Sequence, residues 1–524
     1  MKNPLLLLLV LLLNSSFLWA QTTIPTHADS TDILKEVLNM HKEMPAPKKE
    51  FRKGHVNPRE IKDYYQKTDN GFTIELPHKG LTPSPTIYQG AIYLSGGFGS
   101  KQFYAFDIQS GQKIWGVDLD DDGPSSAVIE DDIVVFNTES CTIFALEAKT
   151  GKQIWSYWLG DPLMSTPTIS NGMVFTAYPA SSAFNSGGGW GNFYQQEQKQ
   201  EQLNEMPYPS TPEKENTYQG KLNPTHVLIA FDLKTGNILW QKWIDGDIMS
   251  APVAEKDGLY VTTFPGTLYK FEAATGKVLS AHASRATSAP VIVDGEIYMS
   301  KRSDSDTSEV AESIAKINMH PGESAPVYQY QYTKKAIYLD QKVQKESDYF
   351  GEANDYDAGN GFGNGAPDNS GWQYASSNIG QSNVSSLQSF QGSRVLHHSG
   401  RNFSTMGDEL VCTDPTSGEV IWTKPLKGDL TKSGGHLATP PLAVNGRLII
   451  ATLEGEVIVS KEKTGEEIMR FSTGEQIRYQ PVVDQGKIYV TTMKGKMFCF
   501  ETKDKKLTGW TTWGANAAHT NRVE

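Results

Sequence analysis

From about residue 71 onward, short apolar runs alternate with turn residues in a pattern typical of β-hairpins. An apolar run leads into a Gly, Asn-Gly or Asp-Gly turn, and a second run rich in β-branched residues follows. The clearest segments are SPTIYQGAIYL, TPTISNGMVF, APVIVDGEIYM, PPLAVNGRLII and QPVVDQGKIYV. Because turn residues between apolar runs favour a tight reversal of the chain, each segment predicts two antiparallel strands.

The hairpins alternate with an eleven-residue phrase that predicts two further strands. It reads Ala, an acid two residues on, Gly four residues later and Trp at the end, with clear copies at 105–115, 145–155, 230–240 and 412–422. Weaker copies begin near residues 270, 459 and 499. We expect the acid to end the third strand and the Trp to lie on the fourth. Four antiparallel strands in about 40 residues predict one blade of a β-propeller.

The repeat predicts an all-β fold: an eight-bladed β-propeller of four-stranded antiparallel blades, with a short N-terminal helical arm. The expected blade starts are Pro85, Ser126, Pro167, Pro252, Pro290, roughly Ser393, Pro441 and Pro481. An open ring would leave a strand edge unpaired, so we expect residues 71–77 to form the outer strand of the last blade. Residues 507–513 are the alternative closing strand.

The segments outside the repeat complete the expected organisation. Residues 1–20 read as a signal peptide, with Lys2, an apolar run at 5–13 and a cleavage site after Ala20; a retained membrane anchor is the alternative. An arm at 21–70 precedes the propeller at 71–503, which is followed by a tail at 504–524. The arm contains one expected helix, whose apolar face consists of Ile33, Leu34, Val37, Leu38 and His41.

Composition narrows the classes of partner and the compartment. The formal net charge of −12 argues against nucleic acid or anionic lipid as the main partner. The first of three cysteines is Cys141, so no lipid-bearing Cys follows the leader, and we expect a soluble periplasmic or secreted protein. Cys412 and Cys499 occupy the Ala position of the repeat, where a small buried residue fits, and no disulfide is predicted.

Two insertions interrupt the repeat, at about 180–224 and 335–387. The first follows the second strand of the third blade, and the second joins the fifth blade to the sixth. Strand direction alternates within a blade, so both should emerge on the same face of the ring. Long loops on a compact fold are usually functional or disordered. The shared face therefore favours a cap that faces a partner or ligand, and mobile decoration is the alternative.

Several polar residues are candidates for ligand chemistry. Arg285, Lys432, His436 and Arg478 precede blade starts and form a candidate cationic funnel rim, although unrelated rim charges are the favoured explanation. Asp355, Asp357 and Asn360 are weak candidates for calcium, because their run departs from the calcium-loop template and also reads as plain turns. The run at 120–122 reads as a solvated turn.

His397 and His398 are the only adjacent histidines, and they lie on an expected inner strand. Strand alternation sends their rings to opposite faces, so a shared metal is not expected. The repeated tryptophans read as residues that cover the seam between blades, each with its N–H on a backbone acceptor; stacking against a quinone is the alternative.

These repeats resemble the quinoprotein-type propeller family, whose pyrroloquinoline quinone (PQQ) repeats carry an Ala-x-Asp-x-x-x-Gly-x-x-x-Trp docking motif. The motif positions are Ala105, Asp107, Gly111 and Trp115; Ala145, Glu147, Gly151 and Trp155; Ala230, Asp232, Gly236 and Trp240; and Cys412, Asp414, Gly418 and Trp422. The first and third copies fit fully, whereas Glu147 replaces Asp and Cys412 replaces Ala. The resemblance implies two kinds of relative. One is a periplasmic dehydrogenase with PQQ and calcium in the central funnel, the quinone stacking between a Trp and a disulfide of adjacent cysteines. The other is the propeller component of outer-membrane β-barrel assembly, which binds partners by its loops.

This chain has no adjacent Cys pair and no Cys-x-x-Cys-His haem motif. We therefore expect an exported, non-enzymatic propeller that binds a protein, peptide or glycan through the face with both insertions, as in envelope assembly. The alternative is a PQQ-dependent oxidoreductase with its cofactor and calcium in the funnel.

Overall fold

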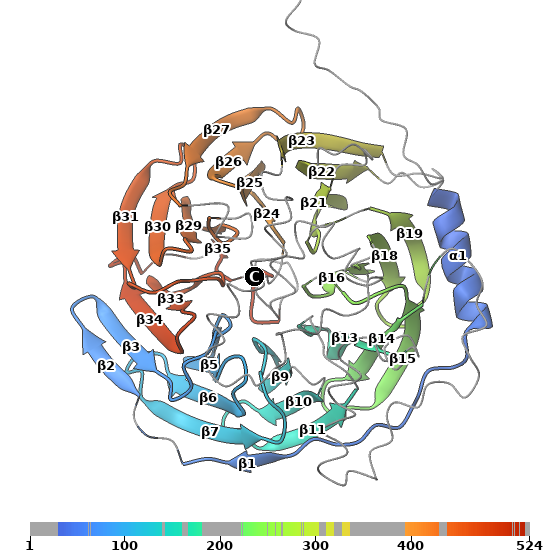
Figure 1. Ribbon diagram of the computed structural model, residues 1–524, viewed down its shortest axis with the longest axis horizontal. Coiled ribbons are helices and arrows are strands. Elements are labelled where there is room, and N and C mark those ends of the chain that lie inside the picture. Colours follow the sequence, from blue (N-terminus) through green and yellow to red (C-terminus); the bar gives the residue numbers. More distant parts are fainter. Residues whose placement is uncertain are drawn as a thin grey trace, which may run out of the picture.

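The chain folds into eight β-sheets arranged radially around one axis (Figure 1). The computed structural model describes residues 30–518 with gaps at 61, 63, 139–141, 160–165, 181–221, 223, 249, 257, 264–265, 285, 287, 303–310, 319–326, 336–392, 429–436, 506, 508 and 513. Within the described residues, the model contains no helix that is both long enough and apolar enough to cross a membrane.

Each sheet contains one four-stranded blade, and in blades 1 to 7 the four strands follow chain order from the axis to the perimeter. Blades 1 to 4 consist of β4 (Thr86–Tyr88), β5 (Ala91–Ser95), β6 (Gln102–Asp107) and β7 (Lys113–Leu119); β8 (Val128–Glu130), β9 (Ile133–Asn137), β10 (Thr142–Glu147) and β11 (Gln153–Trp158); β12 (Thr168–Ser170), β13 (Met173–Pro179), β14 (His226–Asp232) and β15 (Ile238–Ile244); and β16 (Val253–Glu255), β17 (Gly258–Thr262), β18 (Thr267–Glu272) and β19 (Val278–Ala283).

The second half of the ring repeats this arrangement. Blades 5 to 8 consist of β20 (Val291–Val293), β21 (Glu296–Arg302), β22 (Ala311–Asn318) and β23 (Val327–Lys335); β24 (Val395–His398), β25 (Arg401–Met406), β26 (Glu409–Thr413) and β27 (Val420–Pro425); β28 (Leu442–Val444), β29 (Arg447–Ala451), β30 (Glu456–Lys461) and β31 (Glu467–Ser472); and β32 (Val482–Asp484), β33 (Lys487–Thr491) and β34 (Lys496–Glu501) with β3 (Gly71–Glu75). Every inner strand begins one or two residues after its predicted start, which confirms the eight-bladed fold.

The ring is closed by the N-terminal segment, as the pairing argument predicts. β3 pairs antiparallel with β34, with Gly71 opposite Phe500 and Glu75 opposite Lys496. β2 (Tyr65–Thr68) then adds a fifth strand outside β3. The alternative closing segment has another place, because β35 (Gly509–Trp510) pairs with the inner strand β28.

The arm runs around the outer wall of the first four blades. α1 (Ser30–Glu43) packs against β15 and β19, and β1 (Val56–Pro58) pairs with β7 (Figure 1). The predicted apolar face of α1 is correct at Ile33 and Val37 but wrong at Leu38, which is 51% exposed. Met40 and Met44 are buried in its place, because the helix is rotated to set these two residues against the ring.

The tail lies inside the ring. Beyond β35, the N–H groups of Val483, Ile129 and Ile169 donate to the carbonyls of residues 511, 517 and 518, at 2.8, 2.9 and 3.1 Å. These donors belong to β32, β8 and β12. The tail therefore satisfies backbone groups on the inner strands of blades 7, 8, 2 and 3.

Strand direction gives the ring two distinct rims. The loop rim carries the connections between blades and those between second and third strands. The hairpin rim carries the turns between first and second strands and those between third and fourth strands. β13 and β23, after which the two insertions begin, both end at the loop rim. The base of the first insertion is held by a hydrogen bond from the Ala180 N–H to the Thr225 carbonyl (2.9 Å).

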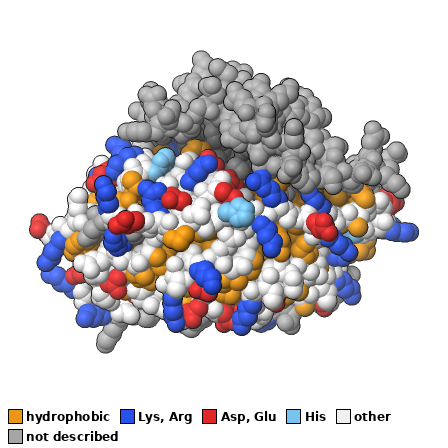
Figure 2. Space-filling model, turned by 90° about the horizontal axis from the view of Figure 1, so that it is seen from below, with side chains coloured by type: hydrophobic (Ala, Val, Ile, Leu, Met, Phe, Trp, Pro, Cys, Tyr) orange, Lys and Arg blue, Asp and Glu red, His pale blue; other side chains and the backbone are white. Residues whose placement is uncertain are grey.

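Seen edge-on, the described outer wall carries Lys and Arg interspersed with Asp and Glu, with apolar patches between them (Figure 2). Aromatic packing fills the seams within, as where Phe103 of blade 1 stacks on Phe136 of blade 2 at 4.2 Å between ring centroids.

Candidate functional site

The repeated tryptophans lie at the seams between blades. Trp115 donates its indole N–H to the carbonyl of Ala148 in the next blade at 2.8 Å. Trp155 and Trp240 make the same bond to the next blade, at 2.7 and 2.9 Å. All three indoles are at most 8% exposed. This arrangement uses both the flat face and the polar atom of each Trp to join neighbouring blades.

The glycine of the motif makes room for the tryptophan of the preceding blade. Gly236 has a φ of +70°, and a Cβ added there would lie 2.7 Å from the Trp155 ring. Gly151 stands in the same relation to Trp115, also at 2.7 Å. The motif Ala pairs across the strands with the motif Trp, as Ala230 does with Trp240. A small residue is needed at both positions because the indole occupies the adjoining space.

The motif acid stabilises the turn that follows it. Asp107 Oδ1 accepts hydrogen bonds from the N–H and the hydroxyl of Ser110, both at 2.7 Å. Asp232 accepts the equivalent pair from Thr235, and Asp414 accepts backbone N–H bonds at 2.8 and 2.7 Å. These bonds favour the ionised carboxylate and lower the pKa of all three acids. Their role in the described turns is local and structural.

The two described cysteines are packed singly in different blades. Burial raises the pKa of the Cys412 thiol to about 11 and that of Cys499 to about 12. Such thiols are neutral and poorly reactive near pH 7. Both fill the small-residue position of the repeat, as the sequence indicates, while Cys141 lies outside the described residues.

A second link between blades, at the loop rim, was missed from the sequence. Asp121 Oδ2 accepts hydrogen bonds from the Thr138 and Thr142 hydroxyls of blade 2, both at 2.6 Å. The expectation of a solvated turn at 120–122 is therefore wrong at Asp121, whose carboxylate bonds the next blade, while Asp120 is exposed. The recurring Thr-x-x-x-Thr spacing was the signal that could have found it.

The same link recurs at the seam between blades 3 and 4. Asp245 accepts from Thr263 at 2.8 Å, from Thr267 at 2.5 Å and from the Tyr269 hydroxyl at 3.0 Å. Burial raises the pKa of this carboxyl although three hydroxyls stabilise its charge.

Few of the predicted ligand residues are among the residues that the structure describes. Arg478 is half-buried at the loop rim just before β32, whereas Arg285, Lys432 and His436 lie outside the described residues. The same holds for the calcium candidates Asp355, Asp357 and Asn360. The cationic funnel and the calcium loop therefore stay predictions.

The two adjacent histidines diverge, as strand alternation predicts. His397 Nδ1 lies 2.7 Å from Asn402 Oδ1, and its ring stacks on Tyr298 of blade 5. His398 turns to blade 7, where its Nδ1 lies 3.1 Å from Glu462 Oε1. The two rings therefore contact opposite neighbouring blades and share no metal site.

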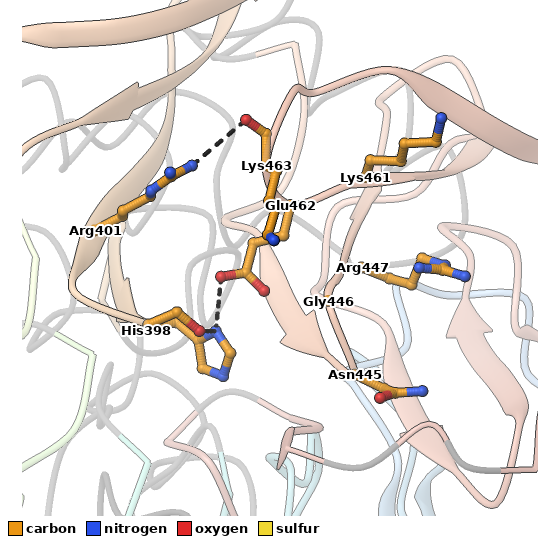
Figure 3. A pocket seen from close by; sticks show the side chains of 9 residues that line it. His398, Arg401, Asn445, Gly446, Arg447, Lys461, Glu462 and Lys463 are labelled. Atoms are coloured by element: carbon orange, nitrogen blue, oxygen red, sulfur yellow. Dashed lines mark hydrogen bonds and ion pairs between the residues drawn. The ribbon is translucent and has the colours of Figure 1, made fainter.

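A cavity of about 580 Å³ opens at the hairpin rim between blades 6 and 7 (Figure 3). We call it the seam pocket, and it forms between the β24–β25, β28–β29 and β30–β31 turns. Its charged lining consists of His398, Arg401, Arg447, Lys461, Glu462 and Lys463. No sequence motif singled out this combination, because the residues come from two blades.

The described residues do not fit the cofactor arrangement that the resemblance implies. Among them, no three His, Cys, Asp or Glu side chains are grouped to hold a metal ion. Trp115, Trp155 and Trp240 are committed to seams by their N–H bonds, and Cys412 and Cys499 are in separate blades. No reaction step through PQQ follows from this part of the chain.

Segments of the chain are similar in sequence to two kinds of known protein. A segment of the chain is 30% identical over 112 residues to quinoprotein alcohol dehydrogenase PedH of Pseudomonas putida, covering 19% of this chain and 18% of PedH. Another match is 23% identical over 213 residues to outer membrane protein assembly factor BamB of Nitrosomonas eutropha, covering 38% of this chain and 41% of that protein. The chain thus matches less than half the length of either relative.

A solved structure and a family model complete the comparison. The crystal structure of the computationally designed Ika8 protein superposes with a TM-score of 0.50 at 11% identity, covering 82% of this chain and 98% of Ika8, which shows a shared fold alone. The family model described as outer membrane protein assembly factor BamB matches residues 100–200, 224–327, 368–452 and 407–521, more than half of the chain. With eight PQQ-type blades and this match, the chain belongs to the BamB family of β-propellers.

Proposed function

We propose that this chain is an exported, non-enzymatic scaffold that holds a protein, peptide or glycan partner against its loop rim during assembly of the cell envelope. The observation that carries the proposal is the position of the two insertions. β13 and β23 run in the same direction relative to the axis, so both insertions begin at one rim. Two long segments on one rim favour a single large contact surface over scattered decoration.

The loop rim also has the rigidity that a binding surface needs. The Asp121 and Asp245 links to threonines of the next blade lie there, and the base of the first insertion is hydrogen bonded at Ala180. A rigid base lowers the conformational entropy lost on binding. Family membership supports a role in assembly, since the family's description names an outer membrane assembly factor.

Export is part of the same proposal. The charged, apolar and small-residue sequence at 1–20 supports a cleavable leader, and on that basis we propose delivery to the periplasm or to the cell exterior.

The experiment removes each insertion while leaving the ring intact. Residues 181–221 or 336–387 are replaced by short Gly-Ser linkers, and the purified variants are cross-linked in envelope extracts of the source organism. We expect β-rich circular dichroism and cooperative unfolding to persist while capture of the partner falls at least tenfold, as for loss of an interface centre. Lys277→Gln at the hairpin rim is the matched control and should capture normally. Capture that survives removal of both insertions would refute the proposal.

A second candidate, a PQQ-dependent oxidoreductase, is favoured by the PedH match. Purified protein is mixed with PQQ and calcium, and the quinone absorbance band and melting temperature are measured. Under our proposal neither changes. Tight uptake of the quinone with a raised melting temperature would establish the second candidate instead.

A further inference from the structure

The seam pocket is strongly cationic in an acidic protein. Its lining includes four side chains that are positive at neutral pH, Arg401, Arg447, Lys461 and Lys463, and one carboxylate, Glu462. The chain as a whole has a net charge of −12. Concentration of one sign of charge in a concave site raises the local concentration of ligands of the opposite sign.

Comparison among the blades shows that these charges are departures from the repeat. The position that ends the third strand is Asp or Glu in blades 1 to 4 and 8, as in Asp107 and Glu272, but blade 7 has Lys461 there. The second strand begins with Ala91, Ile133, Met173 and Gly258 in blades 1 to 4, but with a cation, Arg401, Arg447 or Lys487, in blades 6 to 8. The blade fold therefore requires no cation at either position, and blades 6 and 7 are the neighbours that bring such cations into one pocket.

The cations are only partly neutralised by their neighbours. Glu462 is directed to His398 at 3.1 Å, and Arg401 donates to the carbonyl of Lys463 at 3.4 Å (Figure 3). Lys461 pairs with Glu466 at 2.7 Å, but both side chains are more than half exposed, and such pairs are weak. No described carboxylate pairs with Arg447 or Lys463.

The tryptophan of this seam lacks a bond that its counterparts make elsewhere. Trp422 lies over Gly465 of blade 7, as its counterparts do elsewhere. Its indole N–H, however, finds no acceptor among the described residues, whereas Trp115, Trp155 and Trp240 each bond the next blade. The residue that follows the acid position of the motif is apolar in the blades that accept those bonds, whereas in blade 7 it is Glu462. The seam therefore combines a missing bond with a pocket beside it.

We propose that the seam pocket binds a phosphate-bearing anion, either a soluble phosphate compound or a phospholipid headgroup. Guanidinium groups match phosphate oxygens with paired hydrogen bonds, and ammonium groups add point charge. The volume of about 580 Å³ is within the usual range for small-ligand sites. This site is on the rim opposite the insertions, so it does not depend on the proposed partner.

The test uses Lys461→Asp, which restores the acid found at this position in other blades. Asp in this turn should accept hydrogen bonds from Thr464, as Asp232 does from Thr235, so the variant should fold at least as well. The full chain is titrated with pyrophosphate by calorimetry at low ionic strength. Saturable binding is expected, and it should weaken about tenfold in Lys461→Asp and further with Arg447→Gln, because each removes a charge-assisted contact.

Lys277→Gln is the control, since this Lys lies in the equivalent turn of blade 4 and its loss should leave binding unchanged. A parallel titration compares phosphatidylglycerol vesicles with phosphatidylcholine vesicles. Binding to pyrophosphate identifies a soluble phosphate ligand, and binding to phosphatidylglycerol vesicles alone identifies a lipid headgroup; both support the proposal. Absence of binding to both probes overturns it, and so does equal binding by wild type and folded Lys461→Asp protein.

Discussion

At the scale of residues, tryptophan and glycine meet across the seams of the ring. Added Cβ atoms on Gly151, Gly236, Gly276 and Gly465 would each lie within 2.7 Å of a tryptophan of the preceding blade. Such spacing leaves no room for a methyl group. The Gly and Trp of the motif are therefore needed for contacts between neighbouring blades, even though the motif itself lies within one blade.

This contact predicts that substitution by alanine costs much more stability at one glycine of blade 3 than at another. Gly236 and Gly172 have φ values of +70° and +71°, but only Gly236 faces a tryptophan; Gly172 has open space. Gly172→Ala should cost about 1 kcal/mol of unfolding free energy from backbone strain. Gly236→Ala should cost about 1–3 kcal/mol more, because the methyl group overpacks the seam. Urea unfolding of both variants measures the difference, and equal losses would contradict the contact.

A buried histidine predicts a loss of stability in mild acid. Burial removes water from His226, at the base of the first insertion, and lowers its pKa from the ordinary 6.5 to about 3. Below about pH 6.5 His226 is therefore protonated in the unfolded chain but not in the folded chain, so the free energy of unfolding falls as the pH drops. The expected loss from this residue between about pH 7 and pH 5 is about 2 kcal/mol.

The measurement compares urea unfolding of wild type and His226→Gln across this pH range. The variant should be less stable at pH 7 but should lose less stability on acidification, so the two curves converge. Parallel curves would show that folding does not change the pKa of His226, which would contradict the prediction. His41 and His282, whose pKa values are also lowered by burial, contribute slopes of the same sign to both proteins.

At the scale of elements, one strand decides whether the ring is closed. β3 supplies the outer strand of blade 8, while α1, β1 and β2 lie outside the ring. A closed ring protects the edge of β34, which would otherwise present unpaired backbone groups. The arm and the closing strand should therefore contribute differently to folding.

Two truncations separate these contributions. A chain beginning at Asn70 keeps β3 and should unfold cooperatively, with a lower melting temperature because the α1 contacts are lost. A chain beginning at Lys79 lacks β3 and should lose cooperative unfolding and aggregate through the open blade. Thermal unfolding followed by circular dichroism and light scattering distinguishes them. Cooperative, soluble behaviour of the shorter chain would show that closure is not needed.

At the scale of the whole molecule, the ring separates two surfaces. The loop rim carries both insertions, and the hairpin rim carries the seam pocket, so the proposed partner and the proposed anion would bind on opposite faces. The tail crosses the interior along the inner strands of blades 7, 8, 2 and 3. Occupation of one rim should therefore leave the other available.

Much of this organisation could be predicted because each blade is a local unit. The hairpin turns, the acid that ends a third strand and the Gly after it act within about 40 residues, so the blade starts were found to within two positions. The outward turn of Leu38 was missed, because helical spacing alone gives a broad apolar face and the packing partner sets its centre. Asp121 was missed because its threonine partners belong to the next blade.

The sequence by itself determined the number of blades and the small residues of each motif, and it narrowed the closing strand to two segments, since turn chemistry, alternation and repeat length are local properties. Only the tertiary structure decided which particular residues of neighbouring blades meet beyond the tryptophans. Arg401 and Lys461 are 60 positions apart and share a pocket because blades 6 and 7 are neighbours. The tail likewise meets Ile129 from the far end of the chain. Contacts of this kind depend on ring closure, which brings distant segments together and leaves no periodic trace in the sequence.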